Sequence, residues 1–199
     1  YKKNYNKYKK CKKKITDYLN QASENFKLLK REASNIERAT NLIIESLSTN
    51  NKIIFCGNGG SAADSQHLAA ELMGRYKLDR NPLPAMSLTV DTSAITAIGN
   101  DYGYEQIFSR QLMGIGNKDD VLYATSTSGK SRNVIKAAEK AKELGILVIG
   151  LTGDNQKGLS EIADVSIKVP SNETNYIQEM HIAVGQLICG MVENHFFKK

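Results

Sequence analysis

Apolar side chains recur three or four positions apart through the first quarter of the chain. Between residues 15 and 48 this spacing places them on one side of a helix, which predicts either two helices or one bent helix. The positions are Ile15, Leu19, Phe26, Leu29, Ile36, Ala39, Leu42, Ile43 and Leu47. Because so long a helical segment precedes the first strand, we expect it to pack against a partner subunit as well as its own domain.

After residue 51 the pattern changes to five short apolar runs separated by longer helical stretches. The runs cover residues 53–56, 85–88, 121–124, 147–151 and 165–169. This alternation predicts an α/β fold, a three-layer αβα sandwich with a five-stranded parallel sheet. We divide the chain into a helical segment at 1–50 and an α/β domain at 51–199, which together form one structural unit. Such sheets bind ligands at the carboxyl ends of their strands.

The positive charge is concentrated at the amino-terminal end. The chain has 199 residues, 41% of them hydrophobic and 24% charged, which suits one globular domain, and its net charge is +6. Residues 1–14 hold eight lysines and no acidic residue, so residues 15–199 carry −2. We therefore do not expect the domain to bind nucleic acid. The lysine-rich arm at 1–14 is interpreted as a solvated helix extension, with contact to nucleic acid or an anionic surface as the alternative.

The sequence indicates neither a membrane segment nor an oxidising compartment. No run of about 18 apolar residues is present, and the amino-terminal end lacks the apolar core of a secretory signal. The cysteines Cys11, Cys56 and Cys189 are widely spaced, odd in number and without a CxxC pair, which favours reduced thiols. We expect a cytoplasmic protein with no membrane contact.

The loop after the first predicted strand combines glycines with a helix start. Residues 56–61 read CGNGGS, and Ser61 is a candidate N-cap for a helix over 62–76. Glycines permit close approach of a ligand, and a helix start presents amides and the positive end of the helix dipole to an anion. The loop is neither a Walker A motif nor a GxGxxG fingerprint, so alone it is a weak indication of a binding site.

A loop rich in hydroxyl groups follows the third predicted strand. Residues 125–131 read TSTSGKS and precede an amphipathic helix over 133–144. Ser and Thr hydroxyls can donate to the oxygens of a phosphate monoester without burying a counter-charge. For one such loop an N-cap in a Ser/Thr-rich turn is an equal alternative. Two loops of this kind at neighbouring strand ends favour a phosphate site.

Four segments, in order, resemble the sugar isomerase (SIS) family, and within it the branch that isomerises sedoheptulose 7-phosphate. They are CGNGGSAADSQHLAAELMGRY at 56–76, AIGNDYGYEQIFSRQ at 97–111, STSGKS at 126–131 and YIQEMH at 176–181. The resemblance implies the flavodoxin-like SIS fold and a homotetramer whose active sites combine residues of adjacent subunits. It further implies an isomerase that interconverts sedoheptulose 7-phosphate and D-glycero-D-manno-heptose 7-phosphate through an enediol, supplying heptose for lipopolysaccharide or capsule.

The resemblance assigns the substrate site to the two loops and to two further segments. The serines of both loops are expected to hold the phosphate, with Thr127 and the loop amides completing the shell. Arg75 is a candidate for reaching a phosphate or acid of a neighbouring subunit, and equally a surface arginine. The predicted substrate-binding residues are Asn58, Gly59, Gly60, Ser61, Arg75, Asn100, Asp101, Ser126, Thr127, Ser128, Ser131 and Gln178.

The predicted chemistry centres on one helix face. His67 and Glu71 are four residues apart on the helix that starts at the first loop, so their side chains share a face. Isomerisation needs a base beside the carbonyl carbon, and Glu71 fits that role. The resemblance implies one zinc ion per subunit held by His67, Glu71 and Gln178, which would polarise the carbonyl. The residues with predicted catalytic roles are Glu71, Gln178, Asp101 and Thr127, of which Asp101 would orient a hydroxyl or a water.

One position departs from the family pattern. The family's second acid/base histidine, eight residues after the ligand glutamine, corresponds to Gln186, whose carbonyl is a candidate fourth zinc ligand. An amide does not move protons near neutral pH, so either Glu71 performs both transfers, or His181 or a water relays the proton, or turnover is slow or absent. Apart from that relay, His181 is interpreted as having no role, and His195 as solvated or at an interface.

Two alternative functions stay open. One is a non-catalytic phosphosugar-binding module that resembles the replication-initiator-associating proteins, which lack the acidic residue at the position of Glu71. Retention of Glu71 here argues against it. The other is an isomerase of a related ketose phosphate, because the sequence defines the phosphate site better than the pattern of sugar hydroxyls.

Overall fold

The computed structural model describes residues 2–154 and 157–198 and contains one five-stranded sheet in that part of the chain. All neighbouring strands are parallel, and their order is β2-β1-β3-β4-β5. The strands are β1 (Ile53–Gly57), β2 (Ala85–Ser87), β3 (Val121–Thr125), β4 (Leu147–Thr152) and β5 (Val165–Lys168). The predicted α/β class and the five parallel strands are confirmed, and this strand order places a topological switch point between β1 and β3.

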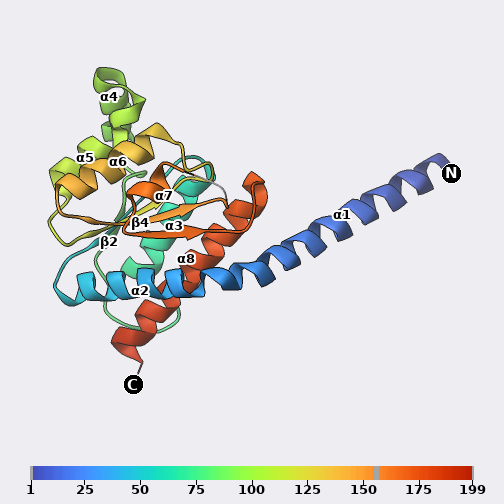
Figure 1. The fold of residues 1–199 in the computed structure, drawn as a ribbon, viewed down its shortest axis with the longest axis horizontal. Coiled ribbons are helices and arrows are strands. Elements are labelled where there is room, and N and C mark those ends of the chain that lie inside the picture. Colours follow the sequence, from blue (N-terminus) through green and yellow to red (C-terminus); the bar gives the residue numbers. More distant parts are fainter. Residues whose placement is uncertain (1, 155–156, 199) are drawn as a thin grey trace.

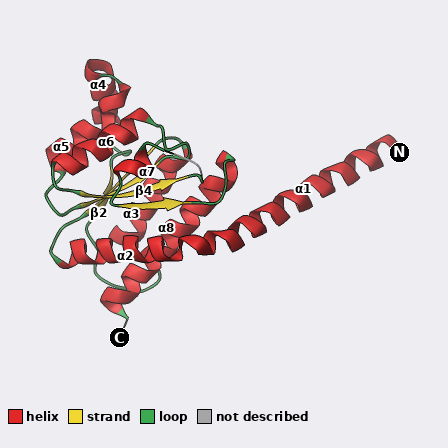
Figure 2. Cartoon of the chain, viewed as in Figure 1, coloured by secondary structure: helices red, strands yellow, loops and turns green. Residues whose placement is uncertain are grey.

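Helices cover both faces of the sheet, and the alternation of side chains along each strand explains why (Figures 1 and 2). On β1, Ile53 and Phe55 pack with α2, α3 and α8, whereas Ile54 and Cys56 pack with α5, α6 and α7. The helices are α2 (Ala33–Ser48), α3 (Gly60–Met73), α4 (Thr92–Tyr102), α5 (Ile107–Ile115), α6 (Arg132–Glu143), α7 (Leu159–Ile162) and α8 (Thr174–Phe197), with a 3-10 turn, η2 (Tyr104–Gln106), before α5.

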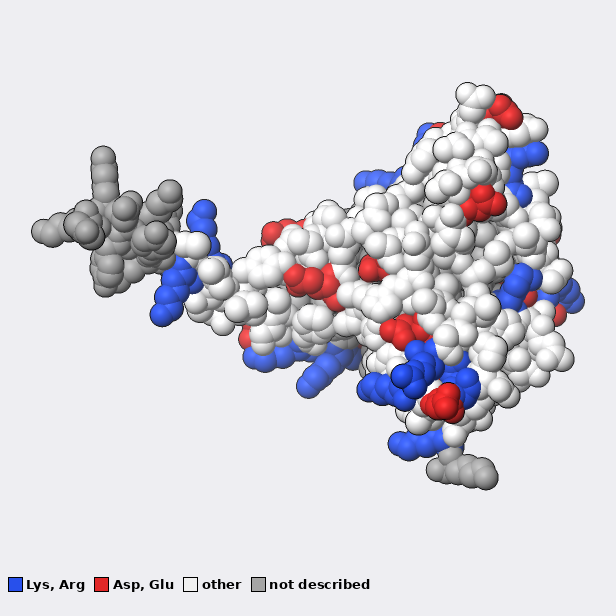
Figure 3. Space-filling view, turned by 180° about the vertical axis from the view of Figure 1, so that it is seen from behind, with Lys and Arg blue, Asp and Glu red and all other residues white. Residues whose placement is uncertain are grey.

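The amino-terminal segment is bent, as predicted, and much of it lies outside the body of the molecule. Helix α1 (Lys2–Leu29) meets α2 at a single 3-10 turn, η1 (Lys30–Glu32). Figure 1 shows α1 extending away from the sheet and its covering helices. Residues 11–21 of α1 are exposed, and Figure 3 shows basic side chains near the outer end of its described part. The interpretation of the arm as a helix extension is therefore confirmed for residues 2–14.

The predicted helix over 62–76 begins and ends earlier in the structure, and Ser61 is not its N-cap. The N-cap is Gly59, with φ +55°, so α3 begins at Gly60 and Ser61 lies inside the first turn. Glycine adopts this left-handed conformation without steric cost, which allows the chain to turn into the helix two residues sooner than predicted. Arg75 and Tyr76 then fall beyond the end of α3.

Cys56 and Cys189 are buried and Cys11 is exposed, and all three are free thiols, as predicted. Burial raises the pKa of the Cys56 and Cys189 thiols to about 12, so both stay protonated near neutral pH.

In the described part of the chain, no helix has the length and hydrophobicity needed to cross a membrane.

Candidate active site

The two predicted anion-binding turns lie side by side because the strands that precede them are neighbours. Gly57 at the end of β1 is paired with Thr125 at the end of β3. We call residues 57–61 the first anion turn and residues 125–131 the second anion turn. Asn58 in the first turn hydrogen-bonds the side chain of Asn133, just after the second turn, at 2.9 Å and 2.8 Å. The structure therefore brings the two turns together at the switch point.

Glycines in the first anion turn are required by close packing as well as by backbone conformation. A Cβ atom at Gly57 would lie 2.7 Å from Cβ of Ser61, and one at Gly60 would lie 2.5 Å from Nε2 of Gln178. The turn therefore tolerates no side chain at either position without displacement of its neighbours. The same contact places the Gln178 side chain, from the first turns of α8, at the start of α3.

Hydroxyl groups of the second anion turn form a compact set. Ser126 donates to the Ser131 hydroxyl at 3.0 Å, and the Ser128 hydroxyl accepts from the Lys130 amide at 3.2 Å. Ser61 and Ser126 are each only 3% exposed, so their hydroxyls face the protein or the space between the turns rather than bulk solvent. Hydroxyl groups rotate to suit a ligand and both donate and accept, which suits them to the oxygens of a phosphate.

His67, Glu71 and Gln186 converge on one point along α3. Nε2 of His67 lies 3.1 Å from Oε1 of Glu71, and Nε2 of Gln186 lies 3.0 Å from the histidine nitrogen and 3.1 Å from the same carboxylate oxygen. Gly185 makes this approach possible, since a Cβ atom there would lie 2.4 Å from Leu68 on α3. The predicted pair on α3 is therefore completed by a residue from α8.

His67, Glu71 and Gln186 offer only a few ligand atoms to a metal ion. Within residues 2–154 and 157–198, no three His, Cys, Asp or Glu side chains gather around one point, so any zinc site here needs amide oxygens. Imidazole and carboxylate are ordinary zinc ligands, and rotation of the Gln186 amide by 180° would present its oxygen in place of Nε2. The residues thus fit a divalent cation in chemical type.

Asp64 adds a further carboxyl group one turn before His67 on α3. Burial raises the pKa of the half-buried Asp64 carboxyl, and the nearby His67 opposes this rise. The helix face beside the anion turns therefore carries two carboxyl groups in different surroundings, of which Glu71 has the direct contacts to His67 and Gln186.

Asn100 and Asp101 are exposed on α4, which projects from the body of the molecule in Figure 1. Their side chains contact each other, with Nδ2 of Asn100 donating to Oδ1 of Asp101 at 2.8 Å. Helices α4 and α5, joined by η2, form a helical hairpin, which we call the hairpin. It is nevertheless connected to the first anion turn, because the Tyr104 hydroxyl donates to Oδ1 of Asn58 at 3.0 Å. Arg75 is exposed beyond the end of α3 and is not joined to these side chains within one chain.

Sequence reasoning missed Asn133 and Tyr104, which connect the predicted site segments. Asn133 stands two residues after the last serine of the second turn, and Tyr104 lies within the segment 97–111 that carried the family resemblance. Its place in that segment could have identified Tyr104 as a site residue. No local sequence pattern could have identified Asn133, because its partner Asn58 is 75 residues away.

The structure excludes His181 as a proton relay near neutral pH. Its side chain is only 2% exposed, in the core between α8 and the sheet. Burial lowers the pKa of His181 to about 4, although the backbone of Thr152 acts in the opposite direction. The imidazole is therefore neutral and enclosed at neutral pH, in agreement with its interpretation as a residue without a role. His195 is exposed, as predicted.

A doubly wound sheet with two hydroxyl- and glycine-lined turns at its switch point, beside a His/Glu pair, defines a sugar-phosphate domain of the isomerase type. Residues 17–153 match the model of the SIS domain, and the chain belongs to this family. The predicted family membership is confirmed.

Similar proteins within this family include phosphoheptose isomerases. The enzyme of Akkermansia muciniphila is 54% identical over 175 residues, which cover 88% of this chain and 93% of that protein. That of Rhodospirillum rubrum is 57% identical over 159 residues, covering 80% of this chain and 85% of the relative.

Two solved structures with the same fold are also described as phosphoheptose isomerases. The phosphoheptose isomerase of Neisseria gonorrhoeae aligns with a TM-score of 0.87 at 37% identity, over 92% of this chain and 98% of that one. The Francisella tularensis protein aligns with a TM-score of 0.88 at 34% identity, over 91% and 97%. The predicted SIS fold is thereby confirmed along nearly the whole chain.

Proposed function

We propose that this chain is a phosphoheptose isomerase that interconverts sedoheptulose 7-phosphate and D-glycero-D-manno-heptose 7-phosphate through an enediol. The observation that carries the proposal is the placement of the His67–Glu71 pair on the helix that starts at the anion turns. At 1.5 Å per residue, His67 lies about 9 Å along α3 from Ser61. Glu71 lies about 15 Å along the helix from Ser61, so the proposal requires that a sugar whose phosphate is held at the turns extends along α3 toward Glu71.

The chain's own residues divide the work of binding and proton transfer. Ser61, Ser126, Ser128 and Ser131 hold the phosphate, with Thr127 and the turn backbone around it. The Glu71 carboxylate removes the proton from the carbon beside the carbonyl and returns it to the former carbonyl carbon on the same side of the enediol. As the enediol forms, the carbonyl oxygen takes up a proton from water, and as the new carbonyl forms, the other enediol oxygen releases one to water. A single base suffices for both transfers because the two carbons are adjacent.

Gln186 orients the base rather than exchanging protons. Its Nε2 donates to Oε1 of Glu71 at 3.1 Å and contacts the His67 ring nitrogen at 3.0 Å. An amide keeps its protons near neutral pH, and the buried His181 is not available as a substitute. Of the routes left open by the sequence, this arrangement favours Glu71 as the group that performs both transfers.

A zinc ion, one per subunit, belongs to the same proposal, and His67, Glu71, Gln178 and Gln186 would hold it. Gln186 would bind through its amide oxygen, so its Nε2 contact with Glu71 orients the base only while no ion is bound. When bound, the ion supplies Lewis-acid polarisation of the sugar carbonyl. Asp101 orients a hydroxyl or a water in the site, and Asn100 beside it contacts the substrate. A cytoplasmic location and the supply of heptose for lipopolysaccharide or capsule complete the proposal, which rests here on the activity named for the relatives.

The activity is tested by NMR of purified protein with sedoheptulose 7-phosphate, with and without added zinc. We expect signals of the heptose 7-phosphate aldose to appear, and turnover of five- and six-carbon ketose phosphates to be slower. Equal or faster turnover of a shorter ketose phosphate would assign the enzyme to that substrate. Absence of aldose product at high enzyme concentration, with substrate binding retained, would contradict isomerase activity and favour a non-catalytic module.

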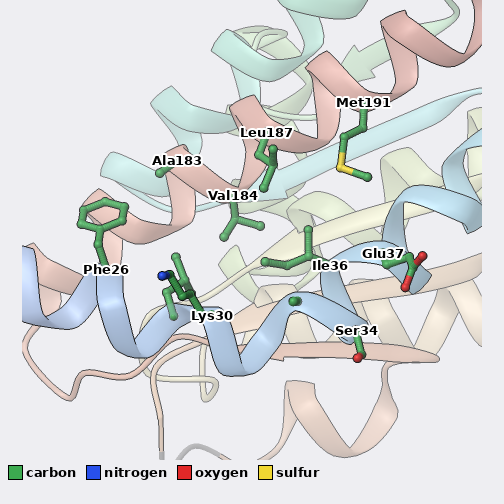
Figure 4. Close-up of a pocket in the computed structure, with 11 residues that line it drawn as sticks. Phe26, Lys30, Ser34, Ile36, Glu37, Ala183, Val184, Leu187 and Met191 are labelled. Atoms are coloured by element: carbon green, nitrogen blue, oxygen red, sulfur yellow. The ribbon is translucent and has the colours of Figure 1, made fainter.

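We further propose that the protein is a homotetramer, because the amino-terminal helices leave apolar surface uncovered. Ile15, Leu19 and Leu28 on α1 are 56%, 60% and 56% exposed. A groove of about 570 Å³ lies between the α1–α2 segment and α8, and Figure 4 shows Phe26, Leu187 and Met191 among its lining side chains. A second copy of this chain, with the same exposed helices, is the occupant that fits both surfaces. In this assembly Arg75 reaches the active site of an adjacent subunit.

Sedimentation velocity at micromolar concentration tests the assembly. We expect a mass of four chains for the native protein and a shift toward smaller species for Leu187→Glu, because a charge placed in the groove opposes burial. Met113→Glu is the matched control, since Met113 is similarly exposed (55%) but lies on α5, on the other side of the sheet. A stable native monomer would contradict the tetramer.

A further inference from the structure

Asn58 and Asn133 form a reciprocal amide pair between the two anion turns. Nδ2 of Asn58 donates to Oδ1 of Asn133 at 2.9 Å, and Nδ2 of Asn133 donates to Oδ1 of Asn58 at 2.8 Å. Each amide is therefore both donor and acceptor toward the other, which fixes the orientation of both planes. We call this contact the amide pair.

Asn133, one member of the amide pair, is buried, so the pair is not a contact between two surface side chains. Asn133 is 3% exposed, and its Oδ1 also accepts from the Val134 amide at 3.0 Å within the first turn of α6. Hydrogen bonds out of contact with water contribute more, and cost more to break, than those at the surface. Because both groups are neutral, the pair joins the turns without adding charge beside an anion.

A third segment is attached to the same point. The Tyr104 hydroxyl donates to Oδ1 of Asn58 at 3.0 Å, although Tyr104 itself is 62% exposed. The next residue, Glu105, bridges Arg132 at 2.9 Å and Lys136 at 2.6 Å on α6. The hairpin that carries Asn100 and Asp101 is thereby held against the start of α6, next to the amide pair.

We propose that Asn133 is a positioning residue that sets the spacing between the two anion turns, through the amide pair, and that Tyr104 connects this spacing to the hairpin carrying Asn100 and Asp101. The inference rests on the proposed function, because it assigns the phosphate to both turns together. Asn133 lies in the first turn of α6 and contacts the Asn58 side chain rather than Glu71, so we expect it to act on phosphate binding and to leave proton transfer largely unchanged.

The test measures phosphate binding and turnover separately. For Asn133→Ala we expect the Kd for inorganic phosphate, by isothermal titration calorimetry, and the KM for sedoheptulose 7-phosphate to rise together by about 10-fold, while kcat changes by less than about 3-fold. Asn133→Asp keeps the size of the side chain but removes the donor and adds a negative charge. It should weaken phosphate binding more than Asn133→Ala does.

Ser46→Ala is the matched control for a general loss of stability. Ser46 is equally buried (3% exposed) and donates to the Asp119 carbonyl at 2.9 Å, at the opposite, amino-terminal edge of β3. We expect it to lower the midpoint of thermal unfolding without changing the Kd for phosphate. Tyr104→Phe, at an exposed position, should keep the fold and raise KM by about 3-fold through loss of one hydrogen bond.

The inference is overturned if Asn133→Ala and Asn133→Asp bind inorganic phosphate as the native protein does, or if Ser46→Ala weakens phosphate binding by the same factor. It is also overturned if kcat falls while KM and the phosphate Kd stay constant. Failure of the proposed function gives a different result. In that case the native protein binds inorganic phosphate and releases no heptose product, and the Kd values of the variants still decide the role of Asn133.

Discussion

Glu71→Gln should reduce kcat for sedoheptulose 7-phosphate by about 10²- to 10⁴-fold and leave the KM within a few-fold of the native value. The substitution keeps the shape of the side chain and its contacts with His67 and Gln186, which lie at 3.1 Å from Oε1. It removes the lone carboxylate base that we assign to both proton transfers. Initial rates by NMR or by a coupled assay, with circular dichroism to verify the fold, provide the measurement.

Two further variants show whether the loss belongs to Glu71 itself. Glu139→Gln changes an exposed carboxylate on α6 and should have the kcat of the native enzyme. Gln186→His introduces a group able to exchange protons, and it should not restore activity to Glu71→Gln if Glu71 performs both transfers. Recovery of more than a tenth of native kcat in the double variant, or near-native activity of Glu71→Gln alone, would contradict the assignment.

The strands and their parallel arrangement could be predicted because each is an apolar run between two helical stretches. The predicted strand limits differ from the structure by one residue at one end of each strand. The limits of α3 were harder to predict, because Gly59 allows the chain to enter the helix two residues before the start that the Ser61 hydroxyl had suggested. Periodicity reports which face of an element is buried, but it does not report where a glycine allows the backbone to turn.

The parts of the candidate site formed by residues close in the sequence could be predicted. The parts formed by residues far apart in the sequence could not. His67 and Glu71 share a helix face by their spacing alone, and both anion turns follow from strand ends. The contact of Gln186 with that pair depends on the close approach of α8 at Gly185, which no local pattern encodes. The same is true of the amide pair, and of buried charges such as Asp120, which pairs with Lys52 at 2.6 Å while fully enclosed.

A buried ion pair joins the end of α3 to α8 and supports the helix that carries Glu71. Arg80 and Glu193 meet at 3.0 Å with side chains only 1% and 2% exposed. Arg80 also donates to the carbonyls of Leu72 at 2.7 Å and Glu71 at 2.8 Å, which satisfies acceptors in the last turn of α3.

Hydrogen-bond donors also surround the carboxylate of Glu193. Burial alone would raise the pKa of its carboxyl, but hydrogen bonds from the backbone amides of residues 76–78 and from Arg80 outweigh that effect, so the pKa is lowered and the carboxylate stays charged. Both members of the pair are thus ionised in the core, where each depends on the other for compensation.

Removal of either partner should therefore destabilise the protein strongly. We expect Arg80→Met and Glu193→Leu each to lower the free energy of unfolding by about 3–5 kcal/mol, because each leaves one buried charge without its partner. The double variant should lose less than the sum of the two single losses, since it leaves neither charge behind. Urea unfolding followed by circular dichroism, at one protein concentration for all variants, gives these values.

The exposed pair between Lys27 and Glu24 is the control for this comparison. Its side chains are 64% and 59% exposed, so Lys27→Met should leave the free energy of unfolding almost unchanged. Additive losses in the double variant, or single losses as small as that of Lys27→Met, would show that Arg80 and Glu193 act independently. Strong coupling would show that the Arg80–Glu193 pair stabilises the junction between the end of α3 and α8, the two helices that carry Glu71 and Gln186.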